Sequence, residues 1–85
     1  MATVIEIKNK EKPKFDNGEK VKLTLFSRDG HFKNALAMTY FSRDGQIGIV
    51  IGSEPYPLKD KTVFLYKIEI DNRKVELFED CLEIA

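Results

Sequence analysis

Alternation of apolar and polar residues is the strongest pattern along this chain, and it predicts several short strands. Val21, Leu23 and Leu25 alternate with Lys and Thr, as expected for a strand with one buried face. Residues 63–70 form the longest strand candidate, with an aromatic or aliphatic residue at every second position. A further short strand is predicted over residues 3–8. The pattern therefore favours an all-β domain built from short strands.

Turn residues separate these strand candidates. Asn72-Arg73 is predicted to form a two-residue turn that pairs Ile70 with Val75 and keeps one apolar face continuous. Residues 52–61 contain two prolines and end in charged residues, a composition typical of a surface loop.

The pentapeptide Phe-Ser-Arg-Asp-Gly occurs twice, at 26–30 and at 41–45. Asp-Gly is a strong hairpin signal, and a turn at Asp44-Gly45 places Tyr40 opposite Ile49. Between the copies, residues 33–38 favour helix by propensity, whereas the residues that follow favour strand. We predict a long loop or irregular hairpin whose second half pairs with residues 47–51. A single helical turn near 33–38 is the main rival.

Length and composition indicate one globular domain that covers residues 1–85. The chain is 42% hydrophobic and 33% charged, and its formal net charge is zero. The charge is uneven, because residues 1–45 carry nine Lys/Arg and six Asp/Glu whereas residues 46–85 carry five and eight. A dedicated nucleic-acid binder usually has a clear basic excess.

The chain shows no pattern of a secreted or membrane protein. Its single cysteine, Cys81, leaves no intramolecular disulfide, and small secreted domains usually contain several. The first residues lack the layout of a signal peptide, and no apolar run reaches the roughly 20 residues that span a bilayer. We therefore expect a cytoplasmic protein without membrane contact.

Turn and strand residues recur in a spaced framework. It consists of Phe15-x-x-Gly18-x-x-Val21, Gly45-x-x-Gly48-x-Val50, Tyr66-x-Ile68 and Glu79-x-x-Leu82. From residue 15 to residue 84 this framework resembles the SH3-like barrel, and within that group small bacterial domains of the KOW-like kind. The resemblance implies a small SH3-like β-barrel of five or six mostly antiparallel strands over residues 15–84. Residues 1–14 then form a strand and a charged connection. It also implies binding of peptides, RNA or a larger complex, and only seldom catalysis.

The candidate chemistry points away from an enzyme. A structural zinc site needs about four His or Cys ligands, and this chain has only His31 and Cys81. The acids beside Cys81 raise the pKa expected for its thiol and weaken it as a nucleophile. The repeated pentapeptide lacks the acidic residues that a calcium loop requires. We expect no catalytic site, no metal and no cofactor.

A protein partner is the first functional prediction. Tyr56 lies between two prolines and Leu58 follows the second one, so burial of these two side chains is hard to arrange. An exposed aromatic residue beside an aliphatic one is a typical docking point for a partner protein. The segment between the two pentapeptides adds further candidates for the same surface: Arg28, Phe32, Tyr40 and Arg43. We expect a non-catalytic binding module or small regulatory subunit of an intracellular complex. The opposed charges of the two halves also suit self-association.

The alternative prediction is weak binding of RNA or single-stranded DNA. Lysines on the polar side of the strand around Val21, together with neighbouring basic residues, supply the cations that such a ligand needs. This nucleic-acid set comprises Lys12, Lys14, Lys20, Lys22 and Arg43. Its binding should fall steeply with salt, because counterions are released from the phosphates.

Overall fold

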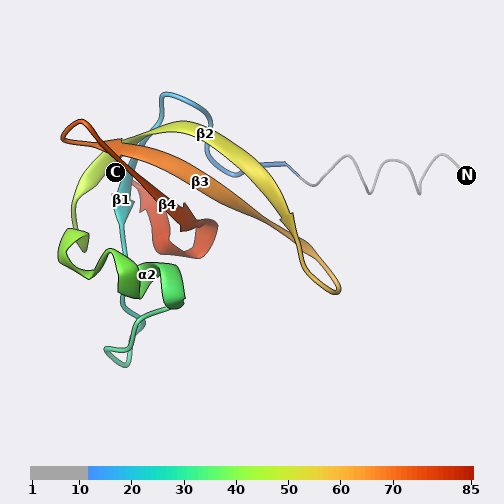
Figure 1. The fold of residues 1–85 in the computed structure, drawn as a ribbon, viewed down its shortest axis with the longest axis horizontal. Coiled ribbons are helices and arrows are strands. Elements are labelled where there is room, and N and C mark those ends of the chain that lie inside the picture. The colour runs from blue at the N-terminus through green and yellow to red at the C-terminus, as the bar shows by residue number, and fades with distance from the viewer. Residues whose placement is uncertain (1–11) are drawn as a thin grey trace, which may run out of the picture.

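Residues 12–85 form one antiparallel sheet of five strands, with the spatial order β4-β3-β2-β1-β5 (Figure 1). The computed structural model describes residues 12–85. The strands are β1 (Lys20–Leu23), β2 (Ile47–Pro57), β3 (Thr62–Ile70), β4 (Arg73–Phe78) and β5 (Leu82–Ile84). The all-β class and the five antiparallel strands predicted from the sequence are confirmed. The strand predicted over residues 3–8 lies outside the described residues.

The sheet is curled but not closed into a barrel. Its two edges are β4 and β5, and the ladders of the described residues do not join them. Only the 3₁₀ turn η2 (Glu79–Cys81) separates the end of β4 from the start of β5. Since so few residues span at most about 14 Å, the two edges must approach each other at this corner. β5 has three residues and pairs with β1, and no ladder among residues 12–85 joins it to β4.

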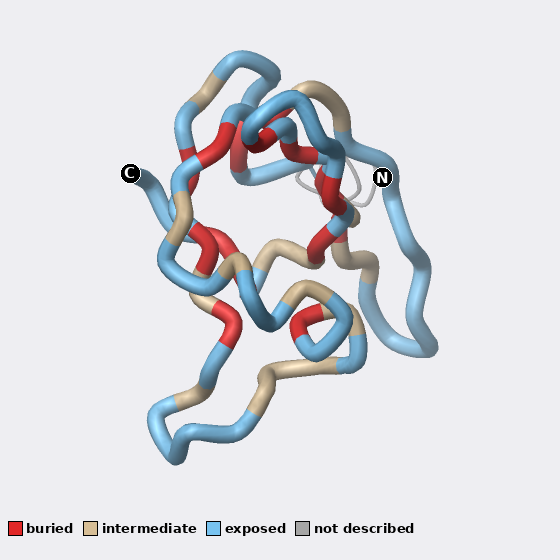
Figure 2. The backbone as a smooth tube through the Cα atoms, turned by 60° about the vertical axis from the view of Figure 1, so that its left-hand side comes forward, coloured by how far each residue is buried: buried red, intermediate tan, exposed pale blue. Residues whose placement is uncertain are grey.

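The core lies on the inner face of the curled sheet, as the alternation predicts. Tyr66, Ile68, Val75 and Leu77 are buried on β3 and β4, and Val21 is fully buried on β1. Figure 2 shows the buried backbone positions gathered around this interior. The buried strand residues thus come from alternate positions that face one side of the sheet.

The segment between β1 and β2 corrects the predicted hairpin. This segment contains a short helix, α2 (Ala35–Thr39), in place of the hairpin. The structure thus agrees with the alternative prediction of a single helical turn near 33–38. The Asn34 side chain caps it, because Oδ1 accepts a hydrogen bond from Ala37 N–H at 2.9 Å. Tyr40 therefore does not pair with Ile49, which lies between Lys20 of β1 and Glu69 of β3.

The two copies of the pentapeptide adopt different structures. In the first copy, Phe26 bridges Phe32, and the two rings stack with centroids 4.6 Å apart. In the second copy, residues 41–43 form the 3₁₀ turn η1 (Phe41–Arg43), and Gly45 N–H donates to Leu23 O at 2.8 Å. Only the first Asp-Gly therefore closes a small hairpin. The second one leads the chain into β2.

The predicted surface loop at 52–61 is wrong, because β2 and β3 remain paired up to Pro57 and Thr62. The register shifts between Val50 and Gly52, which marks a β-bulge. Proline is tolerated beyond the bulge because β1 pairs with Ile47–Ile49 alone, and among residues 12–85 the second half of β2 has no other strand on this edge. Residues 58–61 alone make the turn, where Leu58 N–H donates to Lys61 O at 2.7 Å.

The turn between β3 and β4 lies one residue earlier than predicted. Asp71 and Asn72 occupy it with φ values of 50° and 66°, and Ile70 pairs with Arg73. Two consecutive positive φ values are typical of a type I′ hairpin turn, in which Asn and Asp are favoured. The predicted pairing of Ile70 with Val75 is therefore replaced by Ile68 with Val75. Because the shift is two residues, the apolar face is still continuous.

Candidate functional site

A broad surface depression lies beside the β2–β3 ribbon, which extends beyond the rest of the sheet in Figure 1. We call it the distal groove; its volume is about 840 Å³. Its lining residues come from four separate stretches of chain: Lys14, Asn34, the ribbon residues Tyr56, Leu58, Lys61, Thr62 and Val63, and the corner residues Phe78, Glu79, Asp80 and Leu82. Local strand pairing and the corner at η2 thus build one site.

The apolar wall of the distal groove is formed by the ribbon and the end of β4. Tyr56 lies directly opposite Val63, and its ring meets the Phe78 ring edge-on with centroids 5.3 Å apart. Tyr56 and Leu58 are nevertheless 47% and 46% exposed. Edge-to-face aromatic pairs are favourable, so the ring of Tyr56 is oriented while much of its surface is still available to a ligand.

A hydrogen-bonded tyrosine fixes the chain beside the groove. The buried Tyr66 hydroxyl accepts from Lys14 N–H at 2.6 Å and from Phe15 N–H at 3.3 Å, and it donates to Glu79 Oε1 at 3.2 Å. Burial raises the pKa of the Tyr66 phenol, and the Glu79 carboxylate adds to that increase. The network holds the segment before β1 and one acid of η2 in fixed positions.

The polar wall is tied to the cap of α2. Asn34 Nδ2 donates to Asp80 Oδ1 and to Cys81 Sγ, both at 3.4 Å. Lys33 Nζ donates to Asp80 O at 2.8 Å and to Thr24 Oγ1 at 3.0 Å. The Asp80 side chain is exposed at the groove, so these contacts present a carboxylate on a braced turn.

Among residues 12–85, part of β3 has an edge at the groove without a strand partner. The ladder with β4 runs only from Leu65 to Ile70, because the chain leaves β4 after Phe78. Residues 62–64 are therefore paired with β2 on one side and have no β4 partner on the other. An open strand edge offers backbone donors and acceptors to another extended chain.

The structure brings together only part of the predicted partner surface. Tyr56 and Leu58 line the distal groove, whereas Arg28, Phe32, Tyr40 and Arg43 do not. Arg28 is exposed in the small hairpin at 26–32, which projects from another part of the molecule in Figure 1. Phe32 and Tyr40 are half-buried against the core, and Arg43 Nη1 donates to Gln46 Oε1 at 3.0 Å.

The predicted nucleic-acid residues are spread over different surfaces. Lys12 and Lys14 precede β1, and Lys14 lines the distal groove. Lys20 and Lys22 lie on the outer face of β1, where Lys22 is directly opposite Glu83 of β5. Lys22 thus has an acidic neighbour on this face.

Apart from Lys14, which was assigned to nucleic-acid binding, sequence reasoning missed the groove residues that lie outside the 52–61 segment. Phe78 and Asp80 come more than twenty residues after Tyr56 and reach it only through the observed β2–β3–β4 register. The available signal was Phe78 at the end of an apolar alternation, directly before two acids. Such a pattern marks a strand end but does not identify which loop it meets.

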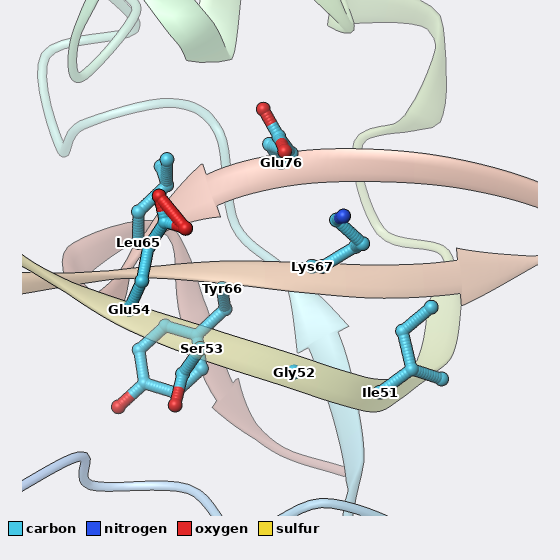
Figure 3. Close-up of a pocket in the computed structure, with 8 residues that line it drawn as sticks. All are labelled: Ile51, Gly52, Ser53, Glu54, Leu65, Tyr66, Lys67 and Glu76. Atoms are coloured by element: carbon cyan, nitrogen blue, oxygen red, sulfur yellow. The ribbon is translucent and has the colours of Figure 1, made fainter.

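A smaller depression of about 210 Å³ lies over the β-bulge, between β2, β3 and β4 (Figure 3). There the Leu65 and Glu76 side chains point to one side of the sheet, whereas Tyr66 and Ser53 point to the other. Their polar atoms do not converge on one centre. This arrangement is a weaker candidate than the distal groove.

Residues 12–85 contain neither a helix that could span a membrane nor a cluster of three metal-ligating side chains. None of the helices there is both long enough and apolar enough to cross a membrane. In the same range, no group of three or more His, Cys, Asp or Glu side chains is arranged to hold a metal ion.

Comparison with known proteins gives no match, since no protein-family model fits the chain and neither a curated protein nor a solved structure is significantly similar to it.

Cys81 is expected to react slowly with thiol reagents in the folded protein. The side chain is fully buried, and burial together with Asp80 raises the pKa of the thiol from 9.0 to about 11. At pH 8 this change alone lowers the thiolate fraction about a hundredfold. Alkylation by iodoacetamide, followed by mass spectrometry, should therefore be at least about a hundredfold slower in buffer than in denaturing urea. Equal rates in the two solutions would contradict the buried position.

Proposed function

We propose that this domain is a non-catalytic protein-interaction module that binds an extended segment of a partner protein in the distal groove. The observation that carries the proposal is the exposure of Tyr56 and Leu58 beside the unpaired stretch of β3. Exposed aromatic and aliphatic side chains supply contact area, and an open strand edge supplies backbone hydrogen bonds. A cytoplasmic setting, as expected from the sequence, belongs to the same proposal.

The groove suits a segment that adds as a strand beside residues 62–64. In this mode backbone pairing gives affinity and alternate side chains give specificity. One apolar side chain of the ligand packs against Tyr56 and Phe78, whose rings already contact each other. A basic side chain of the ligand faces Asp80, whose position is braced by Asn34 and Lys33. The ligand class is therefore an extended peptide with alternating apolar residues and at least one Lys or Arg.

The resemblance of the sequence to SH3-like domains supports a binding role but does not select the ligand. The distribution of charge favours a protein over a nucleic acid. Lys22 is opposite Glu83, and Lys67 and Lys74 are opposite Glu76 and Glu69. A phosphate backbone prefers a continuous basic surface, and these pairs interrupt one.

Selection from a random peptide library tests this proposal, because it does not require the partner to be identified first. Random peptides displayed on phage are selected on the immobilised domain, and the enriched peptides are titrated by backbone amide NMR. We expect alternating apolar sequences with a basic residue, and shifts at Tyr56, Leu58, Val63 and Phe78. Tyr56→Ala should weaken binding at least about tenfold, as for an anchor residue of an interface.

Phe41→Ala is the matched control, because Phe41 is 62% exposed but lies outside the distal groove. It should leave peptide affinity unchanged. Failure to enrich any peptide, or equal losses in the two variants, would reject the groove as a peptide site. A parallel titration with short RNA distinguishes the alternative, since salt-sensitive shifts at Lys20, Lys22 and Arg43 would indicate nucleic-acid binding instead.

A further inference from the structure

Two isoleucines of β2 are exposed on the outer face of the sheet, away from the core. Ile47 and Ile49 are 55% and 42% exposed, whereas the alternate residues Gly48 and Val50 are buried. The two isoleucines line a depression of about 550 Å³. A β-branched apolar pair on the solvent side of a central strand adds nothing to the core.

Charged residues flank these isoleucines, with opposite signs on the two sides. On β1, Lys20 is opposite Ile49 and Lys22 is opposite Ile47. On the β3 side, Glu69 is opposite Ile49, and Asp71 lines the same depression. We call this surface the isoleucine face. It consists of Lys20, Lys22, Ile47, Ile49, Glu69 and Asp71.

We propose that the isoleucine face binds a second copy of this chain in a two-fold symmetric dimer. A rotation of 180° about an axis parallel to β2 and above the face exchanges its β1 side with its β3 side. Each Lys20 then meets Glu69 of the other copy, and each Lys22 meets Asp71. The isoleucines of the two copies pack on each other at the centre. An interface that is its own complement is the requirement for such a dimer.

Charge complementarity argues for a second copy over other occupants. A strongly acidic or basic ligand would meet like charges on one side of the isoleucine face, because both signs lie within the same depression. A second copy places each of the four charges of the isoleucine face opposite a charge of the other sign, and the zero net charge of the chain imposes no long-range repulsion. The proposal is independent of peptide binding, since the distal groove and this depression share no lining residue.

Sedimentation equilibrium of the full chain tests self-association. We expect the weight-average mass to rise from that of a monomer toward twice that value between about 10 μM and about 1 mM protein, the range of weak interfaces. Ile49→Lys should raise the dissociation constant at least about tenfold, and circular dichroism checks that its fold is intact. A monomer at every concentration would overturn the proposal.

Charge reversal provides the sharper test of geometry. Lys20→Glu alone and Glu69→Lys alone should each weaken the dimer at least about tenfold, because each creates two like-charge contacts. The double variant Lys20→Glu/Glu69→Lys should restore association, since the new charges are again opposite and the net charge is that of the natural chain. Lys59→Glu, in the turn at the ribbon tip, is the matched control and should have no effect. Failure of the double variant to recover would overturn the two-fold arrangement.

Discussion

Gly48→Ala is expected to destabilise the domain strongly although it adds only one methyl group. A Cβ at this position would lie 2.5 Å from Ile68 Cγ2, 2.5 Å from Ile70 Cγ1 and 2.8 Å from the backbone oxygen of Glu69. All three atoms belong to β3, and both isoleucines are buried. β-Branched side chains and a paired backbone have little freedom to move aside. The curl of the sheet therefore brings β3 against β2 at a point where only glycine fits.

The expected loss is about 2–3 kcal/mol in the free energy of unfolding, from the range for overpacked sites. A domain of this length has roughly 4–13 kcal/mol in total, so the change is a large fraction. The midpoint of urea unfolding, followed by circular dichroism, measures it. Gly52→Ala on the same strand is the matched control, because nothing lies within 4 Å of its added methyl group. Equal urea midpoints for the two variants would contradict this prediction, because β3 would then have moved aside to make room for the added methyl group.

Gly48 also shows how much of the fold the sequence predicts. The spaced framework marks this position as a strand glycine. Only the three-dimensional structure shows why a glycine is needed there, since β3 packs too close to Gly48 for a side chain to fit. The alternation from Phe64 to Ile70 correctly predicts the buried face, because each strand residue faces one side by geometry alone. Closure of the sheet could not be predicted from alternation. It depends on whether the last strand, Leu82–Ile84, pairs with both β1 and β4, and the ladders of residues 12–85 join it to β1 alone.

The errors at residues 33–41 and 52–61 share one cause, which is that local composition does not reveal pairing. Pro55 argues against a central strand, yet it fits β2 because β1 ends its pairing at Ile49. Asn34 lies in a stretch of mixed propensity, and its cap on α2 decides the competition in favour of helix. At the candidate site, the exposed context of Tyr56 and Leu58 is visible in the sequence. The contribution of Phe78 is not, because its contact with Tyr56 requires the register of three strands.

Tyr66→Phe is expected to have the second large effect on stability. Removal of the hydroxyl leaves the N–H groups of Lys14 and Phe15 without their acceptor, and the Glu79 carboxylate loses a donor. An unsatisfied buried donor costs about 1–3 kcal/mol, so we expect a loss of about 2 kcal/mol near pH 8. Tyr40→Phe is the control, since none of the hydrogen bonds found among residues 12–85 uses the Tyr40 hydroxyl.

The pH dependence of this difference separates the hydrogen bonds from simple packing. Because burial raises the pKa of Tyr66 above 10.0, the folded protein keeps the phenol proton at a pH where the unfolded chain releases it. The stabilisation from the neutral phenol is complete below pH 10 and is lost as the pH rises through the folded pKa. The phenylalanine variant has no such proton to lose. The gap between the urea midpoints of the two proteins should therefore narrow above pH 10. A gap of constant size up to pH 11 would mean that the Tyr66 hydroxyl is not held in this buried network.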